Sequence, residues 1–373
     1  IHFNYSFSDE FWNSYIKFKN SRLNTKDFKS EQYFIISRNL LRNDWMIAYL
    51  FGCSPAVCKS YLSGKKTQLE SFDQHTYYEK NATSLRMGDI GYQNNLEENM
   101  GVHIDYNSLE KYTESLTKAI KEPSDEYKKI GVFSDGYYKQ INENILQIEN
   151  EYYSSVRPKP DPSYTCRPSK GLLKGGVNYI ELRSIDNNIY TNTGIDLEQM
   201  YFIELLIIHS LIQKNDEISD KEYFEIKSNL TTVAHNGRDK NCTIKVNGKN
   251  TLLISSLEKN LEELKKLASL MDKITGDKNY KETIEKQIMK LNDNTKLPSN
   301  IVIDYMTKNK LSFYEYCMKN IEHQKKYFRD LDINTDIMNK LKGEIDNSLK
   351  KRHDLEIDLD ESYETYIKNY FKD

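Results

Sequence analysis

Residues 175–186 place a carboxylate and a guanidinium two positions apart. The segment reads GGVNYIELRSID, and its VNYIELR core has the alternation of a β-strand. Side chains two residues apart in a strand share a face, so Glu181 and Arg183 point one way, and Ile180 and Leu182 the other. Phosphoryl transfer needs a carboxylate that holds Mg²⁺ and a cation that stabilises phosphate charge. The same spacing fits an ordinary cross-strand ion pair equally well.

Three other segments carry polar side chains that suit a ligand site. His2 lies on the polar side of the alternating HFNYSFS, where it could bind a metal or act as a general base. Arg86 lies in the small-residue segment NATSLRMGDIGY, and a guanidinium can grip a carboxylate or phosphate. Asn150, Tyr153 and Arg157 are predicted at a strand end and in the following loop, a common place for sites. From spacing alone, each has a commoner alternative: a solvated side chain for His2, a surface salt bridge for Arg86, and solvation at a strand edge for the third segment.

Composition narrows the class of protein. The chain has 373 residues, of which 38% are hydrophobic and 29% charged, as in globular rather than disordered proteins. Its net charge of −3 argues against nucleic acid or an anionic membrane as a partner. Five cysteines without a CxxC pair indicate reduced thiols and a cytoplasmic location. The longest apolar run, residues 202–212, contains Glu204 and His209 and is too short to cross a bilayer.

Familiar nucleotide-binding and hydrolase motifs are missing from the sequence. SGKKT at 63–67 is similar to the end of a P-loop, but Lys59 stands where that motif requires glycine. The sequence contains no GxGxxG, HExxH or GxSxG. If this protein uses ATP, we expect it to do so without a P-loop.

The elements that position these side chains follow from hydrophobic periodicity and from glycine and proline. Residues 131–153 are predicted to form two strands that meet at a turn at Asp135-Gly136. The proline-rich residues 155–171 are predicted to be an extended loop. Further strands are predicted at residues 1–8 and 177–183, and helices at 29–62 (with a break at Gly52 and Pro55), 108–121 and 196–212.

The final third of the chain is predicted to be nearly all helix. Leucines recur at helical spacing from Leu257 to Leu267, and Gly276 is a suitable C-cap. We expect residues 1–252 to belong to an α+β domain and residues 253–373 to form a helical region packed on the same body.

Six segments occur in order and together resemble one family. They are HFNYSFSDEFW, YLFGCSPAVCKSYLSGK, NATSLRMGDIGY, PSDEYKKIGV, LQIENEYYSSVRPK and LLKGGVNYIELRSID. Taken together they are similar to the proteobacterial type of glutamate–cysteine ligase (γ-glutamylcysteine synthetase). The resemblance is dense from residue 1 to about residue 212, looser from 213 to 260, and weak in the helical tail.

The resemblance implies an activity and a fold. The activity is ATP-dependent joining of the glutamate γ-carboxylate to the cysteine amino group through a γ-glutamyl phosphate, the first step of glutathione synthesis. Mg²⁺ is the implied cofactor, ATP the co-substrate, and a monomer the implied state. The implied fold is similar to that of glutamine synthetase: a curled antiparallel sheet forms a funnel, with helices packed outside. The polar face of VNYIELR would then line the funnel.

The resemblance also implies residue roles at the reacting centre. His2 and Glu181 match metal ligands of the family. Arg183 matches the residue that meets the transferred phosphoryl group, so that Glu181 and Arg183 are the expected catalytic pair. A dianionic acyl phosphate that forms beside an amino-acid carboxylate needs Mg²⁺ and arginine together, because either alone leaves charge uncompensated.

Four further positions match substrate-binding residues of the family. Arg86 matches the arginine that grips the substrate amino acid. Tyr92 and Tyr153 match residues around the cysteine carboxylate, and Asn150 matches a substrate contact. Holding both substrates in one closed site would also protect the acyl phosphate from water.

The sequence departs from the family pattern in two places. The family has a further N-terminal segment with several Mg²⁺-binding glutamates, which would precede His2 and which this sequence lacks. We therefore expect this chain to work with that segment as its partner and to be inactive without it. Some relatives have a disulfide in the region that matches residues 221–253, where this chain has only Cys242.

Two alternatives to this function remain open. A ligase of the same fold could join glutamate to a different amine, and the cysteine pocket would decide between the two. A non-catalytic binding protein derived from the fold is the other alternative. This alternative is disfavoured because the chain retains His2, Arg86, Glu181 and Arg183. Burying such a charged set costs several kcal/mol in desolvation, and a non-catalytic protein has no need of it.

Overall fold

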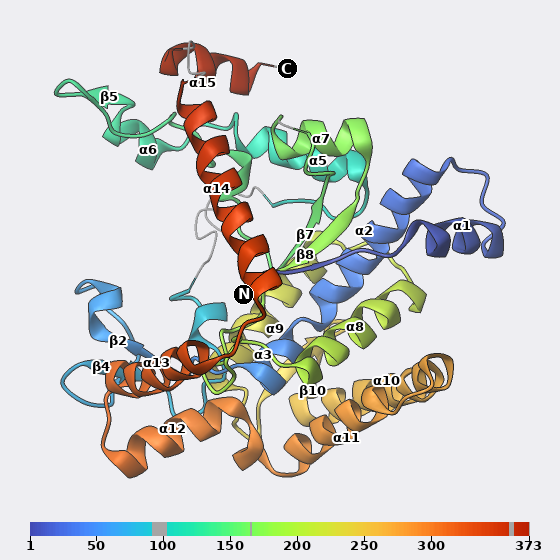
Figure 1. Ribbon diagram of the computed structural model, residues 1–373, viewed down its shortest axis with the longest axis vertical. Helices are drawn as coiled ribbons and strands as arrows, with labels where there is room; N and C mark the ends of the chain where they lie inside the picture. The colour runs from blue at the N-terminus through green and yellow to red at the C-terminus, as the bar shows by residue number, and fades with distance from the viewer. Residues whose placement is uncertain (92–102, 165, 358–361, 373) are drawn as a thin grey trace.

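The computed structural model describes residues 1–91, 103–164, 166–357 and 362–372. Within these residues, helices surround small antiparallel sheets in an α+β arrangement (Figure 1). The strands are β1 (Phe3–Tyr5), β2 (Ala56–Cys58), β3 (Glu70–Ser71), β4 (Thr76–Tyr78), β5 (Phe133–Ser134), β6 (Tyr137–Tyr138), β7 (Val156–Lys159), β8 (Tyr179–Leu182), β9 (Thr243–Val246) and β10 (Lys249–Leu252).

Helices make up most of the regular structure. The α-helices are α1 (Asp9–Phe18), α2 (Thr25–Asn43), α3 (Trp45–Phe51), α5 (Leu109–Ala119), α6 (Asp125–Ile130), α7 (Pro168–Gly175), α8 (Leu197–Ile212), α9 (Asp220–Asn236), α10 (Leu253–Thr275), α11 (Asn279–Asn292), α12 (Pro298–Asn309), α13 (Phe313–Asp330), α14 (Thr335–Ile357) and α15 (Tyr363–Phe371). Short 3₁₀ turns are η1 (Lys59–Leu62), η2 (Leu85–Met87), η3 (Glu149–Glu151) and η4 (Asn294–Lys296).

The sheet that carries the candidate site has β8 at its centre, between antiparallel β1 and β7. Its register places Asn4 and Arg157 on either side of Glu181. Ile180 and Leu182 are fully buried in the main hydrophobic core, to which α2 contributes. The predicted alternation along VNYIELR is therefore observed, with one face apolar and buried and the opposite face polar.

The core behind this sheet is helical. Helices α2 and α8 pack together, and α10 and α11 cover α8 from outside. The predicted helix at 196–212 is confirmed as α8, whose N-cap Asp196 accepts a hydrogen bond of 2.7 Å from the backbone N–H of Gln199. The predicted helix at 108–121 is confirmed as α5, and Ser108 caps it in the same way through the N–H of Lys111.

The predicted hairpin with its turn at Asp135-Gly136 is confirmed, but its strands are much shorter than the predicted range of residues 131–153. Strands β5 and β6 have two residues each, joined where Asp135 and Gly136 both have positive φ. Beyond β6 the chain is irregular, because side chains form hydrogen bonds with the backbone N–H and C=O groups that would otherwise pair with a neighbouring strand. Gln147 Oε1 accepts from the N–H of Ile141 at 2.7 Å, and the side chain of Asn142 donates to the carbonyl of Gln147.

The prediction of an extended loop over residues 155–171 is also wrong in part. Residues 156–159 form β7, and α7 begins at Pro168. Pro158 is tolerated in β7 because this is an edge strand of its sheet, where only alternate N–H groups are needed for pairing. Pro168 is the first residue of α7, where a backbone N–H would have no acceptor within the helix, so the N–H that proline lacks is not needed.

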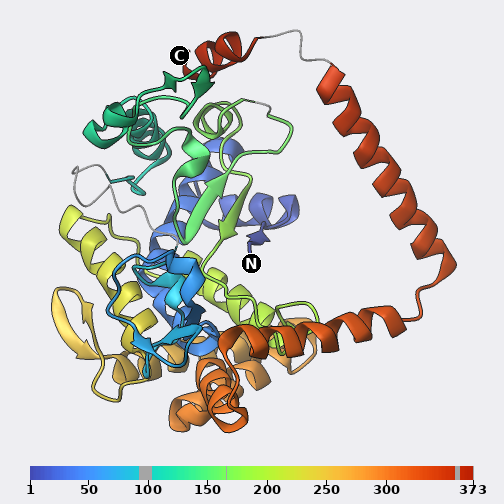
Figure 2. The same cartoon turned by 90° about the vertical axis from the view of Figure 1, so that its left-hand side faces the viewer.

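The C-terminal helices begin on the body and then leave it. Helix α10 ends at Gly276 with φ of +80°, which confirms the predicted C-cap. Helices α13 and α14 extend away from the sheet, and no residue from 335 to 356 is buried (Figure 2). Helix α15 contacts the body again: Glu364 accepts a 2.5 Å hydrogen bond from the Tyr138 hydroxyl, and the Tyr370 hydroxyl accepts one of 3.2 Å from the N–H of Glu149. Among the described residues, no helix has the length and apolar character needed to cross a membrane.

Candidate active site

The polar face of the β1–β8–β7 sheet gathers charge around one carboxylate. Glu181, 9% exposed, lies at its centre. The Nδ1 of His2 and the Nε of Arg183 each lie 3.6 Å from a carboxylate oxygen of Glu181, and the Nζ of Lys159 lies 3.9 Å away. Arg157 is directly opposite Glu181 in the ladder. The cationic side chains of Arg157, Lys159 and Arg183 thus lie on one sheet face around this carboxylate, as suits a site for phosphate or carboxylate groups.

Strand β7 brings Arg157 and Lys159 to this face. Lys159 was not predicted as a site residue, because the prolines around it indicated a loop. The signal that could have found it is the two-residue spacing in VRPK, which places both cations on one side once the segment is a strand. Burial lowers the pKa of Lys159, and Arg157 and Arg183 lower it further, whereas Glu181 raises it.

Arg183 is also held by His2 and Tyr153. Its Nε–H donates to the Nε2 of His2 at 3.1 Å, and its guanidinium carbon lies 5.0 Å from the centroid of the Tyr153 ring. Burial lowers the pKa of His2, and the charge of Arg183 lowers it further. A neutral imidazole is therefore favoured, which can accept this hydrogen bond or ligate a metal.

Arg86 reaches the same end of β8 from η2. Its Nε–H donates to Asp186 Oδ1 at 2.7 Å, and both Nη groups donate to the carbonyl oxygen of Arg183 at 3.1 Å. Nη1 also donates to the Tyr153 hydroxyl at 3.2 Å. Burial alone would lower the pKa of Arg86, but Asp186 and Tyr153 outweigh it and raise that pKa. Three predicted site residues, Arg86, Tyr153 and Arg183, thus lie in direct contact.

Asp186 was not selected from the sequence, although it is central to this arrangement. It follows β8 by four residues and is 3% exposed. Its partner Arg86 lies 100 positions earlier in the chain, so only the folded topology brings the two together. No local spacing in the sequence signals this pair.

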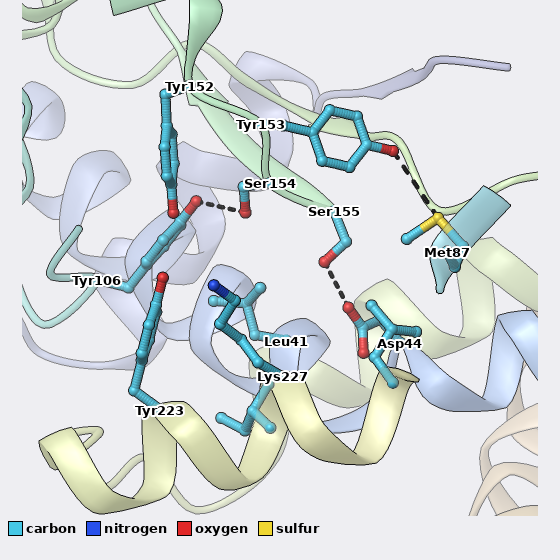
Figure 3. Close-up of a pocket in the computed structure, with 12 residues that line it drawn as sticks. Leu41, Asp44, Met87, Tyr106, Tyr152, Tyr153, Ser154, Ser155, Tyr223 and Lys227 are labelled. Atoms are coloured by element: carbon cyan, nitrogen blue, oxygen red, sulfur yellow. Dashed lines mark hydrogen bonds between the residues drawn. The ribbon is translucent and has the colours of Figure 1, made fainter. Parts of the chain in front are cut away.

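A small cavity opens beside Tyr153, between the segment that precedes β7, the C-terminal end of α2, and α9 (Figure 3). Its accessible volume of about 60 Å³ has room for a few water molecules rather than for an amino acid. Asp44, 1% exposed, lines the cavity and accepts a hydrogen bond from the Ser155 hydroxyl. Burial raises the pKa of Asp44 to about 7, although the bond from Ser155 opposes the shift.

Two predicted substrate contacts lie apart from the charge cluster. Asn150 is in η3 and exposed, and its link to the sheet is its own carbonyl oxygen, which accepts from Arg157 Nη1 at 3.4 Å. Tyr92 lies outside the described residues. The predicted metal ligands His2 and Glu181 are brought together. Within the described ranges, however, no group of three or more His, Cys, Asp or Glu could hold a metal ion.

The geometry can be compared with known proteins. The family model for glutamate–cysteine ligase matches residues 1–233. The glutamate–cysteine ligases of Alcanivorax borkumensis and Shewanella halifaxensis are each 34% identical to this chain over its whole length. The chain covers 72% of the first relative and 71% of the second.

Solved structures agree with the sequence matches. The crystal structure of glutamate–cysteine ligase from Francisella tularensis in complex with AMP superposes with a TM-score of 0.89 at 27% identity, covering 99% of this chain and 72% of that one. A bifunctional glutathione synthetase from Pasteurella multocida has a similar fold, with a TM-score of 0.61 at 18% identity over 88% of this chain and 36% of that one. As the resemblance of its motifs predicted, this chain belongs to the glutamate–cysteine ligase family.

Proposed function

We propose that this chain joins the γ-carboxylate of glutamate to the amino group of cysteine at the expense of ATP. The products are γ-glutamylcysteine, ADP and phosphate, in the first step of glutathione biosynthesis. Family membership and the AMP bound to the Francisella tularensis relative support the use of ATP. The observation that carries the proposal is the position of Glu181 between His2, Lys159 and Arg183 on one sheet face.

The cations of this face suit a reaction in which negative charge moves between oxygens. Transfer of a phosphoryl group to the glutamate γ-carboxylate spreads charge over the transferred oxygens. In this proposal Arg183 faces that charge, which its contacts with His2 and Tyr153 support, and Lys159 adds a second cation beside the other oxygen of Glu181. Cations that are already in place need no reorganisation as charge develops.

A Mg²⁺ site at Glu181 and His2 is part of the proposal. Mg²⁺ usually keeps several waters and is held by one or two carboxylates together with substrate phosphates. The carboxylate of Glu181 beside a neutral His2 fits an ion that the nucleotide helps to hold, and a complete protein cage is not needed. When bound, Mg²⁺ supplies neutralisation of the phosphate charge.

The substrate side of the proposed site begins at Arg86. We assign it to the carboxylate of the amino-acid substrate, with Tyr153 and Tyr92 around the cysteine carboxylate and Asn150 as a further contact. The contact of Arg86 with the Tyr153 hydroxyl supports a shared pocket for these two residues. The polar face of β8 would line a funnel formed by a curled sheet, as in glutamine synthetase.

The setting of the enzyme is part of the same proposal. All five cysteines of the chain are free thiols, which suits the reducing cytoplasm. The proposed monomeric state rests on the family resemblance alone.

The test is ADP release by the protein purified as the cell makes it, supplied with Mg-ATP and glutamate, with and without cysteine. Cysteine-dependent ADP release with formation of γ-glutamylcysteine is expected. Release that depends on another amine but not on cysteine would keep the ligase chemistry and change the substrate. No release with any amine would overturn the proposed activity.

A further inference from the structure

One buried carboxylate, that of Asp186, joins three segments around the candidate site. Its Oδ1 accepts from Arg86 Nε–H at 2.7 Å and from the Ser84 hydroxyl at 3.0 Å. Its Oδ2 accepts from the backbone N–H of Cys53 at 2.9 Å and from the Ser54 hydroxyl at 2.7 Å. Asp186 thus ties the end of β8 to the turn after α3 and to the η2 segment that carries Arg86.

The donors around Asp186 are of two kinds. Cys53 N–H and Arg86 Nε–H are fixed donors that cannot become acceptors, and each takes a different oxygen. The hydroxyls of Ser54 and Ser84 can rotate and can either donate or accept. Only a carboxylate, which accepts at both oxygens, satisfies the two fixed donors at once.

The contacts of Arg86 depend on this arrangement. Because its Nε–H is bound to Asp186, its Nη groups are turned toward the Tyr153 hydroxyl and the Arg183 carbonyl. The guanidinium is planar and its donors have a fixed geometry, so holding one edge sets the direction of the others. Asp186 itself is 3% exposed and lies behind Arg86, away from solvent.

We propose that Asp186 is the positioning residue for Arg86, and that through Arg86 it sets the affinity of the enzyme for glutamate. The proposal rests on the substrate role that the proposed function gives to Arg86. Asp186 touches no substrate; its carboxylate orients the guanidinium that does, and the same guanidinium holds the backbone carbonyl of Arg183. Substrate binding and the phosphoryl-facing arginine are therefore linked through one buried side chain.

Asp186→Asn is the informative substitution, because it keeps the shape of the side chain. An asparagine has one oxygen and one NH₂ group, so it can satisfy only one of the two fixed donors. With its oxygen on the backbone N–H of Cys53, its NH₂ group would face Arg86 Nε–H and turn the guanidinium away. The KM for glutamate is expected to rise about 10- to 100-fold, as for the loss of a charged hydrogen bond, with a smaller change in kcat.

The decisive experiment is a double-mutant cycle of Asp186→Asn with Arg86→Ala in the enzyme purified as the cell makes it. If Asp186 acts through Arg86, Asp186→Asn raises the glutamate KM in the wild-type background and has no further effect in the Arg86→Ala background. Ser54→Ala is the matched control: it removes a donor from the oxygen that Arg86 does not use, and the glutamate KM should stay normal.

The outcomes separate the two proposals. A raised KM in Arg86→Ala with a normal KM in Asp186→Asn would overturn the role of Asp186 alone. Equal effects of Asp186→Asn in both backgrounds would do the same, since Asp186 would then act through Cys53 and Ser54. A normal glutamate KM in Arg86→Ala would overturn the substrate role of Arg86 and, with it, the positioning proposal.

A second measurement serves if Asp186→Asn does not fold. In Arg86→Ala, the acceptors formed by Asp186, the Arg183 carbonyl and the Tyr153 hydroxyl remain. Millimolar guanidinium chloride is expected to lower the raised glutamate KM at least severalfold, whereas sodium chloride at equal ionic strength is not. A folded Arg86→Ala enzyme that guanidinium does not rescue would contradict the proposal.

Discussion

The guanidinium of Arg183 lies over the ring of Tyr153, with its carbon 5.0 Å from the ring centroid, while its Nε–H donates to His2. One cation is thus held from two sides by uncharged groups. On the polar sheet face its charge is paired with the carboxylate of Glu181, at 3.6 Å.

Loss of the Arg183 guanidinium should slow the chemical step more than it weakens binding. In Arg183→Ala, kcat is expected to fall by about 100- to 1,000-fold, the range seen when one preorganised charge-stabilising group is removed, with a smaller change in KM. Steady-state kinetics with saturating ATP measures both. Lys59→Ala is the control, because Lys59 also lies over a ring, 4.9 Å from the Tyr77 centroid, but outside the β1–β8–β7 sheet. An unchanged kcat in Arg183→Ala would refute the assigned role.

Neutralising Glu181 should change the metal requirement. Glu181→Gln removes the carboxylate that lies between His2, Lys159 and Arg183, so the Mg²⁺ concentration for half-maximal activity is expected to rise about tenfold or more. A Mg²⁺ titration at fixed ATP measures it. In Glu204→Gln the requirement should stay normal, since Glu204 accepts from the hydroxyl of Tyr5, outside the charge cluster. An unaltered titration in Glu181→Gln would remove that residue from the metal site.

His235 should make the stability of the fold depend on pH. Its Nδ1 lies 2.6 Å from Glu79, and its Nε2 lies 2.9 Å from Asp89, which follows the η2 segment. Burial lowers the pKa of His235, but the two carboxylates outweigh it and raise that pKa above 6.5. The folded state then binds the proton more tightly than the unfolded state. The stabilisation is full below pH 6.5 and is lost as the pH rises through the raised pKa.

The measurement is the difference in Tm between wild type and His235→Gln, which should be larger at pH 6 than well above neutrality. His209→Gln should give the opposite trend, because burial lowers the pKa of His209. A histidine that is held neutral stabilises the fold above pH 6.5 and loses that effect as the pH falls. The same pH trend in both variants would contradict the assignment of His235.

Gly343 should weaken α14 locally. It lies in the interior of an exposed helix, and a Cβ there would meet nothing within 4 Å. Gly343→Ala is expected to stabilise α14 by about 0.5–1 kcal/mol. Slower amide exchange along α14 measures this, and unchanged exchange would contradict it. Gly276→Ala should instead lower the Tm, because Gly276 has φ of +80° at the end of α10.

Particular residues explain how much of the fold and of the candidate site could be predicted from the sequence. The VNYIELR strand and the helix after Asp196 were predictable, because alternation and capping are local signals. Strand β7 was missed because Pro158 normally argues against a strand, and only its edge position in the folded sheet allows it. Lys159 was missed with it.

Contacts over long sequence distances could not be predicted from composition or spacing. Asp186 and Arg86 are each ordinary charged residues in the sequence, and their 2.7 Å contact depends on how β8 and η2 pack. The contact between His2 and Arg183 likewise joins residues 181 positions apart. The family resemblance suggested a common site for some of these residues. It did not indicate which of their side chains form hydrogen bonds with one another.

Helix α14 connects α15 to the rest of the chain across a distance of about 35 Å, given its 23 residues at 1.5 Å per residue. Because α14 itself has no buried residue from 335 to 356, its contribution to the contact between Glu364 and Tyr138 is to tether the two partners. The contact is intramolecular, and its strength depends on the effective concentration that the helix imposes. A single peptide-bond cut in α14 would turn it into a bimolecular contact, whose occupancy would then fall with dilution.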